Sequence, residues 1–488
     1  MAEISKKKLS GESLWSIGAS LLVAVFGIGY IVIIGNQWGS NGLGIFSLSL
    51  SIYFFGSILG NLGLHQAIIF EIAQETEQAG QTITTGLLGS LGMGIMTGTL
   101  GYLAADLIAG VFQQPSMKPM IQLFCLAMPL FLLNKTLQGV YNAYRDLKLL
   151  SLSQILRGAS ILIALLVLLW QDQSLELIPY AFIAAESLLL LIFGMILLLK
   201  YPLGLPQWQI FKKLLAFGWK SSLSGVLSDA NSRLDIIVIG LFWSASTVGV
   251  YTLATHLAKG LWLLPGAVQR VTNPLLVQLY AKKDWVRLEQ TIQRLLKLGI
   301  PFFILLSGGL ALTAEWLITI LYPAQPEMLG ALLPLYLLLP GSILFASISL
   351  IGSAPSSSIG KPENALYIML GTLISNLVLN LALVPIYGNA GAAIATGISL
   401  LIATGIFAFF TQKYLNLHLP YLAMGLQFSL LLGLGLALHQ WGGGVSALLL
   451  LPGGMIGLLI LMTLLGLLGK GEWKQARDLV ISQNKGSA

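Results

Sequence analysis

"IVIIGNQWGSNGLGIFSL", residues 31–48, has a near-copy at residues 236–253, which read "IIVIGLFWSASTVGVYTL". The two stretches align without a gap at an offset of 205 positions. The identical positions outside the aliphatic run are Trp38 with Trp243, Gly35 with Gly240, Gly44 with Gly249 and Leu48 with Leu253. Several of these matches lie in the connection between two apolar segments, where lipid does not dictate composition. An internal repeat therefore explains them better than chance similarity between two apolar helices.

The composition around this repeat is that of a membrane protein. The chain has 488 residues, of which 56% are hydrophobic and only 9% are charged, and its mean hydropathy is +0.84. We find fourteen apolar stretches of the 18 to 25 residues that cross a hydrocarbon core of roughly 30 Å. Backbone polar groups cannot be left unpaired in lipid, so each stretch should be a helix. The sequence predicts an all-α polytopic membrane protein with about 14 transmembrane helices.

The distribution of basic residues predicts the orientation. Most of the 26 Lys and Arg residues fall on one side of the predicted membrane if the N-terminus is cytoplasmic. We therefore expect both termini in the cytoplasm, with the first span, residues 14–34, as a retained signal anchor. The net charge of +7 is then a consequence of topology, and we expect no nucleic-acid partner.

Both copies of the repeat run outward, turn and start back, so the repeated units should have the same orientation. Such parallel repeats are related by an axis along the membrane normal. We expect an N-lobe of helices 1–6 at residues 1–205, a C-lobe of helices 7–12 at residues 206–418, and helices 13–14 with a cytoplasmic tail at residues 419–488. Two such lobes can enclose a cavity that opens alternately to either side. A weaker third echo, "VPIYGNAGAAIATGIS" at residues 384–399, predicts a turn and close helix packing.

Ionisable residues inside apolar spans cost roughly 2.5 to 3.5 kcal/mol each on insertion scales and mark candidate sites. The second copy of the repeat has gained such residues next to it: Asp229, Arg233 and Asp235 correspond to Ala24, Ile28 and Tyr30 in the first copy. Asp229 and Arg233 stand four positions apart, so a neutralised pair within the helix is one interpretation. The other is that they line the transport cavity.

Further ionisable residues lie in other predicted spans. His256 and Lys259 share one side of the predicted helix 246–268. Lys259 needs either a distant acidic partner or an anionic ligand, and His256 could carry a proton or make an interhelical hydrogen bond. In the first half of the chain, Lys135 and Arg157 are candidate ligand contacts, and Glu186 could balance one of these charges or carry a coupling proton.

We predict from these residues a cavity that binds an anionic ligand. The expected substrate-binding residues are Arg233, Lys259 and Lys135, with Arg157 and Arg270 at the inner mouth of the cavity. The expected ion-coupling or charge-balancing residues are Asp229, Asp235, Glu186 and His256. Phosphate would relieve the cost of these buried cations, since charge-assisted hydrogen bonds are strong at low dielectric and Arg offers a planar fork.

Three stretches carry a resemblance to a known family: "WGSNGLGIFSLSLSIYFFGSILGNLGLHQAI", "DIIVIGLFWSASTVGVYTLATHLAKG" and "SSIGKPENALYIMLGTLISNLVLNLALVPIYGNAGAAIATGIS". In their order along the chain they resemble the polysaccharide-repeat-unit (O-antigen, Wzx-type) flippases of the multidrug/oligosaccharidyl-lipid/polysaccharide exporter superfamily. The resemblance implies that two six-helix lobes move a polyprenyl-pyrophosphate-linked oligosaccharide from the inner to the outer leaflet of the cytoplasmic membrane by alternating access. Members often carry basic residues in the first two helices, and this chain has none there.

The alternatives are a lipid II flippase or a cation-coupled multidrug exporter of the same superfamily. Arg233 and Lys259 argue against the exporter, which needs an acidic pocket for cationic drugs. An enzyme is disfavoured because the predicted outer loops are short and nearly uncharged. The chain has no phosphate-binding loop for nucleotide, and its single Cys125 excludes an intrachain disulfide. We expect no cofactor or metal, membrane lipids as partners, and coupling to a proton or sodium gradient or to consumption of the product.

Overall fold

The structure is a computed structural model that describes residues 6–74, 77–351, 363–415, 419–441 and 457. These residues form helices and turns and no strand. The helices are α1 (Lys6–Asn61), α2 (Leu64–Gln74), α3 (Ala79–Val111), α4 (Met117–Ala143), α5 (Leu147–Trp170), η1 (Leu175–Leu177), α6 (Pro179–Lys200), α7 (Trp208–Phe242), α8 (Ala245–Gly260), α9 (Leu263–Ala281), α10 (Trp285–Leu321), η2 (Pro326–Ala331), α11 (Leu332–Ser349), α12 (Glu363–Leu415) and α13 (Tyr421–Trp441). The predicted all-helical fold class is confirmed.

Nine helical segments among the described residues are long and apolar enough to cross a membrane. Two of them, within Gly18–Gln74 and Glu363–Leu415, are kinked and each covers two of the predicted spans. Helix α7 is not among the nine, because charged and polar residues interrupt its apolar run. The last of the fourteen apolar stretches, residues 445–468, lies outside the described residues except for Gly457, so the count of about 14 stays a prediction. The chain is a multi-pass membrane protein.

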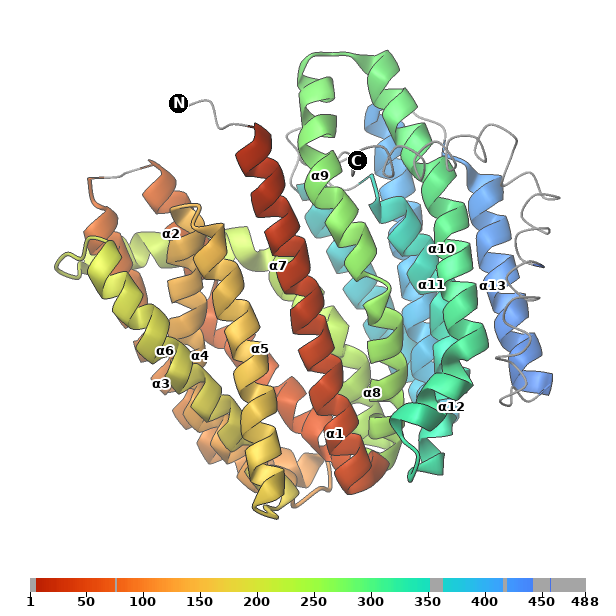
Figure 1. Cartoon of the computed structure of the whole chain (residues 1–488), viewed down its shortest axis with the longest axis horizontal. Coiled ribbons are helices and arrows are strands. Elements are labelled where there is room, and N and C mark those ends of the chain that lie inside the picture. Colours follow the sequence, from red (N-terminus) through yellow and green to blue (C-terminus); the bar gives the residue numbers. More distant parts are fainter. Residues whose placement is uncertain (1–5, 75–76, 352–362, 416–418, 442–456, 458–488) are drawn as a thin grey trace, which may run out of the picture. The chain divides into compact units, whose positions relative to one another are not determined.

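The helices divide into two compact units, Met1–Thr252 and Leu253–Ala488. In the first unit α4 packs against both α3 and α6, α1 packs against α5, and α7 packs against α2 (Figure 1). In the second unit α11 packs against α10, α12 and α13. The predicted lobe boundaries follow the sequence repeat rather than these contacts, and they stay a prediction.

The repeat has the same local structure in both copies. In the first copy, α1 kinks at Gly39, whose φ of 66° lies in the left-handed region that glycine tolerates without strain. In the second copy, α7 ends at Phe242, the backbone is extended at Trp243, the equivalent of Trp38, and α8 starts at Ala245. The third echo kinks at Gly388, with φ of 56°. The arrangement of an apolar helix, a tight turn and a second helix therefore occurs three times in the described part of the chain.

Within the first unit the two copies of the repeat touch each other reciprocally. A β-carbon on Gly44 would collide with the backbone carbonyl of Ala245, and one on Gly249 would collide with that of Ser40. Gly44 and Gly249 are equivalent positions, and so are Ser40 and Ala245. A β-carbon on either glycine would also lie 3.0 Å from the backbone nitrogen of the other. The Ser40 hydroxyl hydrogen-bonds the Ser246 hydroxyl at 2.6 Å beside this contact. The matched glycines are explained by an approach of two backbones that leaves no room for a side chain.

Two predicted segments differ from the structure. The predicted span 246–268 is wrong as a single helix, since α8 ends at Gly260 and α9 begins at Leu263. Pro265 explains the break, because proline is tolerated in the first turn of a helix but not in its interior. The basic and polar stretch 280–297 reads as a separate amphipathic helix on the membrane surface, but in the structure α9 ends at Ala281 and the rest, from Trp285, begins the long helix α10.

Candidate functional site

A cavity of about 330 Å³ lies within the first unit, between helices α1, α4, α5 and α6. Apolar and aromatic side chains form most of its wall, and polar side chains of α4, α5 and α6 complete it. The polar and charged lining residues are Tyr30, Asn134, Lys135, Gln138, Gln154, Arg157 and Glu186. Three of the nine predicted site residues, Lys135, Arg157 and Glu186, therefore line one cavity.

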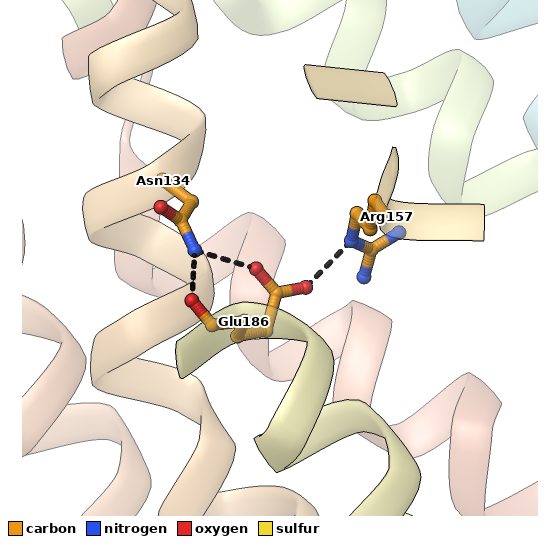
Figure 2. Close-up of polar contacts among 3 residues, drawn as sticks. All are labelled: Asn134, Arg157 and Glu186. Carbon is orange, nitrogen blue, oxygen red and sulfur yellow. Dashed lines mark hydrogen bonds and ion pairs between the residues drawn. The ribbon is translucent and has the colours of Figure 1, made fainter. Parts of the chain in front are cut away.

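Arg157 on α5 forms an ion pair with Glu186 on α6. The distance from Arg157 Nε to Glu186 Oε1 is 2.5 Å, and the Glu186 side chain is fully buried. Asn134 on α4 approaches the same carboxylate from the other side (Figure 2). Its amide nitrogen donates to Glu186 Oε2 and to the Glu186 backbone oxygen, both at 2.8 Å. Three helices are thus joined at one buried carboxylate, and this contact fits the charge-balancing role predicted for Glu186.

The pairing leaves hydrogen-bonding groups of the same residues unused. The Nη2 atom of Arg157 and the Oδ1 atom of Asn134 are buried and have no hydrogen-bond partner. The Arg157 guanidinium also lies 4.9 Å from the centroid of the Phe131 ring. Since Glu186 engages the Nε edge, the remaining donors of the guanidinium are available to a ligand in the cavity.

Lys135 lines the same cavity, and the carboxylate among the lining residues, Glu186, is paired with Arg157 instead. Among the described residues, no ion pair or hydrogen bond to its ammonium group is found. The charge of Arg157 is close enough to interact with that of Lys135. The cavity therefore holds two cations and one carboxylate. A net positive charge inside a membrane protein is costly, so the site favours an anion.

Arg233 of α7 lies beside this cavity. Its guanidinium carbon is 3.8 Å from the centroid of Phe54, and Phe54 lines the cavity. Within the described residues, Arg233 and Asp229 form no ion pair, although they are four positions apart on α7. Asp229 is exposed, and its charge interacts with those of both Arg233 and Lys135. Of the two interpretations of this spacing, a neutralised pair within the helix is not what the structure shows.

Asp235 has a different environment. Its side chain is buried, and Oδ2 accepts a hydrogen bond of 2.8 Å from the Tyr251 hydroxyl of α8. This bond ties the end of α7 to the start of α8 across the turn of the second repeat. Its predicted role in ion coupling or charge balance stays a prediction.

The other predicted residues lie in the second unit. His256 is half-buried and Lys259 is exposed, both on α8. Arg270 lies in α9, and its side chain is outside what the structure describes. Their participation in substrate binding stays a prediction.

The aromatic part of the cavity wall was not predicted from the sequence. Tyr30, Phe54, Phe131 and Phe182 all line it, and Phe54 and Phe131 carry the two guanidinium groups on their faces. No signal in the sequence distinguishes these rings from the aromatic residues that face lipid. Such cation–π contacts stabilise a partly desolvated guanidinium by about 1 to 2 kcal/mol.

Comparison with known proteins places the chain in a family. The sequence model of a family described as "Polysaccharide biosynthesis protein" matches residues 40–327, more than half of the chain. The chain belongs to this family. The expected resemblance to polysaccharide-repeat flippases is thereby confirmed at the level of the family.

Two relatives cover most of the chain. The probable flippase AglR of Haloferax volcanii is 23% identical over 450 residues, which are 86% of this chain and 87% of the relative. A protein of Shigella flexneri that carries the name O-antigen transporter is 20% identical over 408 residues, 80% of this chain and 94% of the relative.

Two solved structures share the fold. The lipid II flippase MurJ in its inward closed conformation superposes with a TM-score of 0.73 at 15% identity, covering 92% of this chain and 99% of MurJ. An inward-facing multidrug MATE transporter of the MOP superfamily superposes with a TM-score of 0.64 at 14% identity, covering 83% of this chain and 98% of the transporter. At these identities the likeness concerns the fold alone.

Proposed function

We propose that this protein flips polyprenyl-pyrophosphate-linked oligosaccharide repeat units from the inner to the outer leaflet of the cytoplasmic membrane by alternating access. The family and the two relatives described as a flippase and an O-antigen transporter support a lipid-linked saccharide as the substrate. Membrane lipids would surround the apolar helices, and the distribution of basic residues supports cytoplasmic termini.

The observation that carries this proposal is the excess of positive charge in the cavity of the first unit. A pyrophosphate has several negative charges and many acceptor oxygens, so it can engage the Lys135 ammonium and the free donors of Arg157 together. Arg157 presents a planar fork that Glu186 holds in place, whereas Lys135 acts as a point charge. Arg233 stands beside the cavity and adds to its positive potential.

The same charges argue against a cation-coupled multidrug exporter. A cationic drug in this cavity would meet Lys135 and Arg157 and would find one carboxylate, Glu186, already engaged by a cation. The lipid II flippase alternative shares the pyrophosphate chemistry, and its support is the similarity of fold.

We propose that Lys259 and Arg270, which lie in the second unit, contact the substrate at another stage of transport. An ion gradient or consumption of the flipped product would drive the cycle. The groups for ion coupling would be Asp235 or His256, since the exposed Asp229 is expected to have little effect on export.

The test is complementation of a strain that lacks the gene. Deletion should make lipid-linked repeat units accumulate in the inner leaflet, and the wild-type gene should restore their export. Lys135→Ala and Arg157→Ala should each lower export at least about tenfold, the effect of losing one charge-assisted contact of about 1.5 kcal/mol or more. Arg233→Ala and Lys259→Ala should also fail to restore it.

A matched control lies on the same helix as Lys135. Lys118 is exposed at the start of α4, where it pairs with Asp106 at 2.9 Å, away from the cavity lining. Lys118→Ala should insert and export like the wild type. Full export by both Lys135→Ala and Arg157→Ala, at normal abundance in the membrane, would refute an anionic ligand in this cavity.

A further inference from the structure

A second hollow lies on the outside of the first unit, between α3 and the start of α7. It is an apolar groove of about 380 Å³, lined by Thr85, Leu88, Gly89, Gly92, Met93, Met96, Pro206, Gln207, Trp208 and Phe211. The side chains of Leu88, Met96 and Trp208 are each more than half exposed. Two glycines of α3 form its floor, and a β-carbon on Gly92 would meet no atom within 4 Å. The groove is thus open along a helix that spans the membrane.

The length of the groove matches one leaflet of a bilayer. From Thr85 to Met96 the helix rises about 16 Å, at 1.5 Å per residue. Half of a hydrocarbon core of roughly 30 Å is about 15 Å. A single acyl chain that enters at the level of Thr85 would reach the middle of the membrane at Met96. This agreement favours a chain that belongs to one leaflet.

The end of the groove near Thr85 is polar and electropositive. The backbone N–H of Gln207 donates to the Thr85 hydroxyl at 2.9 Å, which fixes the start of α7 at this level. Helix α7 begins here with no side-chain cap and no acidic residue in its first turn, so its first N–H groups and the positive end of its dipole lie at this end of the groove.

Lys212 adds a full charge at this end. Its ammonium lies 5.6 Å from the centroid of Trp208, one of the groove residues. The next residue, Lys213, is paired with Glu71 at 2.6 Å. For Lys212, in contrast, no ion pair is found in the part of the chain that the structure describes. A phosphate at the mouth of the groove would therefore meet an unpaired lysine and an uncapped helix start.

We propose that this groove binds an anionic bilayer phospholipid, with one acyl chain between α3 and α7 and the phosphate at Lys212 and the start of α7. The site is separate from the transport cavity and does not depend on which substrate is carried. Its occupant is a structural lipid of the leaflet that borders Lys212.

The test is quenching of Trp208 fluorescence in nanodiscs by lipids with brominated acyl chains, with the Trp208→Phe variant used to isolate the Trp208 signal among the eleven tryptophans. Brominated phosphatidylglycerol should quench Trp208 at about fivefold lower mole fraction than brominated phosphatidylcholine, since a basic residue near an anionic surface contributes about 1 kcal/mol. Lys212→Gln should bring the two lipids to near equality.

A second experiment fills the groove with a side chain. Gly92→Leu places a side chain in open space, so it should fold normally and abolish quenching of Trp208 by either lipid. Gly110→Leu is the matched control, because Gly110 is an exposed glycine of the same helix that also has no neighbour within 4 Å. Equal quenching by the two lipids in the wild type, or unchanged quenching in Gly92→Leu, would overturn the proposal. Displacement of brominated phosphatidylglycerol by a polyprenyl phosphate at a much lower mole fraction than by unbrominated phosphatidylglycerol would assign the groove to the transported lipid instead.

Discussion

In the first copy of the repeat Tyr30 packs edge-on against Phe46, with ring centroids 6.0 Å apart. The equivalent positions of the second copy are Asp235 and Tyr251, and there the tyrosine hydroxyl donates a hydrogen bond to the carboxylate at 2.8 Å. One pair of positions thus connects the two helices of each copy, by an aromatic contact in one and by a polar contact in the other. The shared backbone geometry fixes which positions meet, and the side chains decide the chemistry of the contact.

The two copies of the repeat also differ in their charged residues. In α1 the positions equivalent to Asp229 and Arg233 are apolar, whereas Arg233 of α7 stacks on Phe54 beside the cavity. The first copy contributes rings to the cavity, and the second copy brings a cation next to it. What the two copies have kept in common is the glycine pair at their mutual contact. The two copies therefore share the close glycine contact, whereas only the second copy carries a charged residue next to the cavity.

The largest effect should come from substituting the glycines that the two copies share. Gly44→Ala and Gly249→Ala each push a methyl group into a backbone carbonyl, and each should destabilise the protein by at least about 3 kcal/mol. The effects should be similar because the contact is reciprocal. The buried thiol of Cys125, the single cysteine, reports unfolding through its reactivity in a thermal scan.

Gly110→Ala is the control for these variants, since a β-carbon there meets nothing within 4 Å. It should leave the unfolding midpoint unchanged or slightly raised, because alanine favours a helix over glycine. Unfolding midpoints should be compared at one scan rate, as membrane proteins unfold irreversibly. Tolerance of alanine at only one of the two shared positions would show that the contact is not reciprocal.

The next effect should separate the polar contact from the aromatic one. Tyr251→Phe removes a donor from the buried Asp235 and should destabilise the protein by about 1 to 3 kcal/mol. Tyr30→Phe, at the position equivalent to Asp235, keeps the ring contact and should change stability by less than about 1 kcal/mol. The same thermal scan measures both. Equal losses of stability in the two variants would mean that the hydrogen bond between Tyr251 and Asp235 does not stabilise the second copy.

A smaller effect on export is expected when Arg233 is replaced by lysine, which keeps the positive charge but lacks the planar guanidinium group. Arg233→Lys cannot stack a planar group on Phe54, and the loss of about 1 kcal/mol of cation–π energy should lower export about fivefold. Lys220→Arg, at an exposed position of the same helix, should export like the wild type. Wild-type export by Arg233→Lys would show that the ring contact has no part in transport.

The smallest effect is expected at Asp229. Its side chain is exposed and forms no ion pair with Arg233 in the described part of the chain. Asp229→Asn should therefore leave stability within about 0.5 kcal/mol and change export by no more than about twofold. Abolished export with normal stability would contradict this expectation and would favour the ion-coupling role that was predicted for Asp229.

Much of the fold could be predicted because lipid imposes strong and simple constraints on a chain. Long apolar stretches must be helices, and the third echo at residues 384–399 predicted a turn that the structure has at Gly388. The turn of the first copy lies at Gly39, which aligns with Ser244 and is not one of the matched glycines. The break between α8 and α9 could not be read from hydropathy, because the apolar run continues through it. Only the backbone chemistry of Pro265 explains it.

The candidate site could be predicted in part. Buried cations are rare enough to stand out in an apolar sequence, so Lys135, Arg157 and Arg233 were identified from residue type alone. Their partners could not be identified in this way. The spacing of Asp229 and Arg233 suggested a pair that the structure lacks, while Arg157 pairs with Glu186, 29 positions away on another helix.

By itself, then, the amino-acid order determined that this is a helical membrane protein with an internal repeat and with cations in costly surroundings, since hydropathy, length and charge act locally. Only the packing of helices decided which carboxylate meets which cation, which rings line the cavity and which groups stay unpaired. These are contacts between residues far apart in the chain, and the helix–helix packing that creates them depends on the shapes of many side chains together.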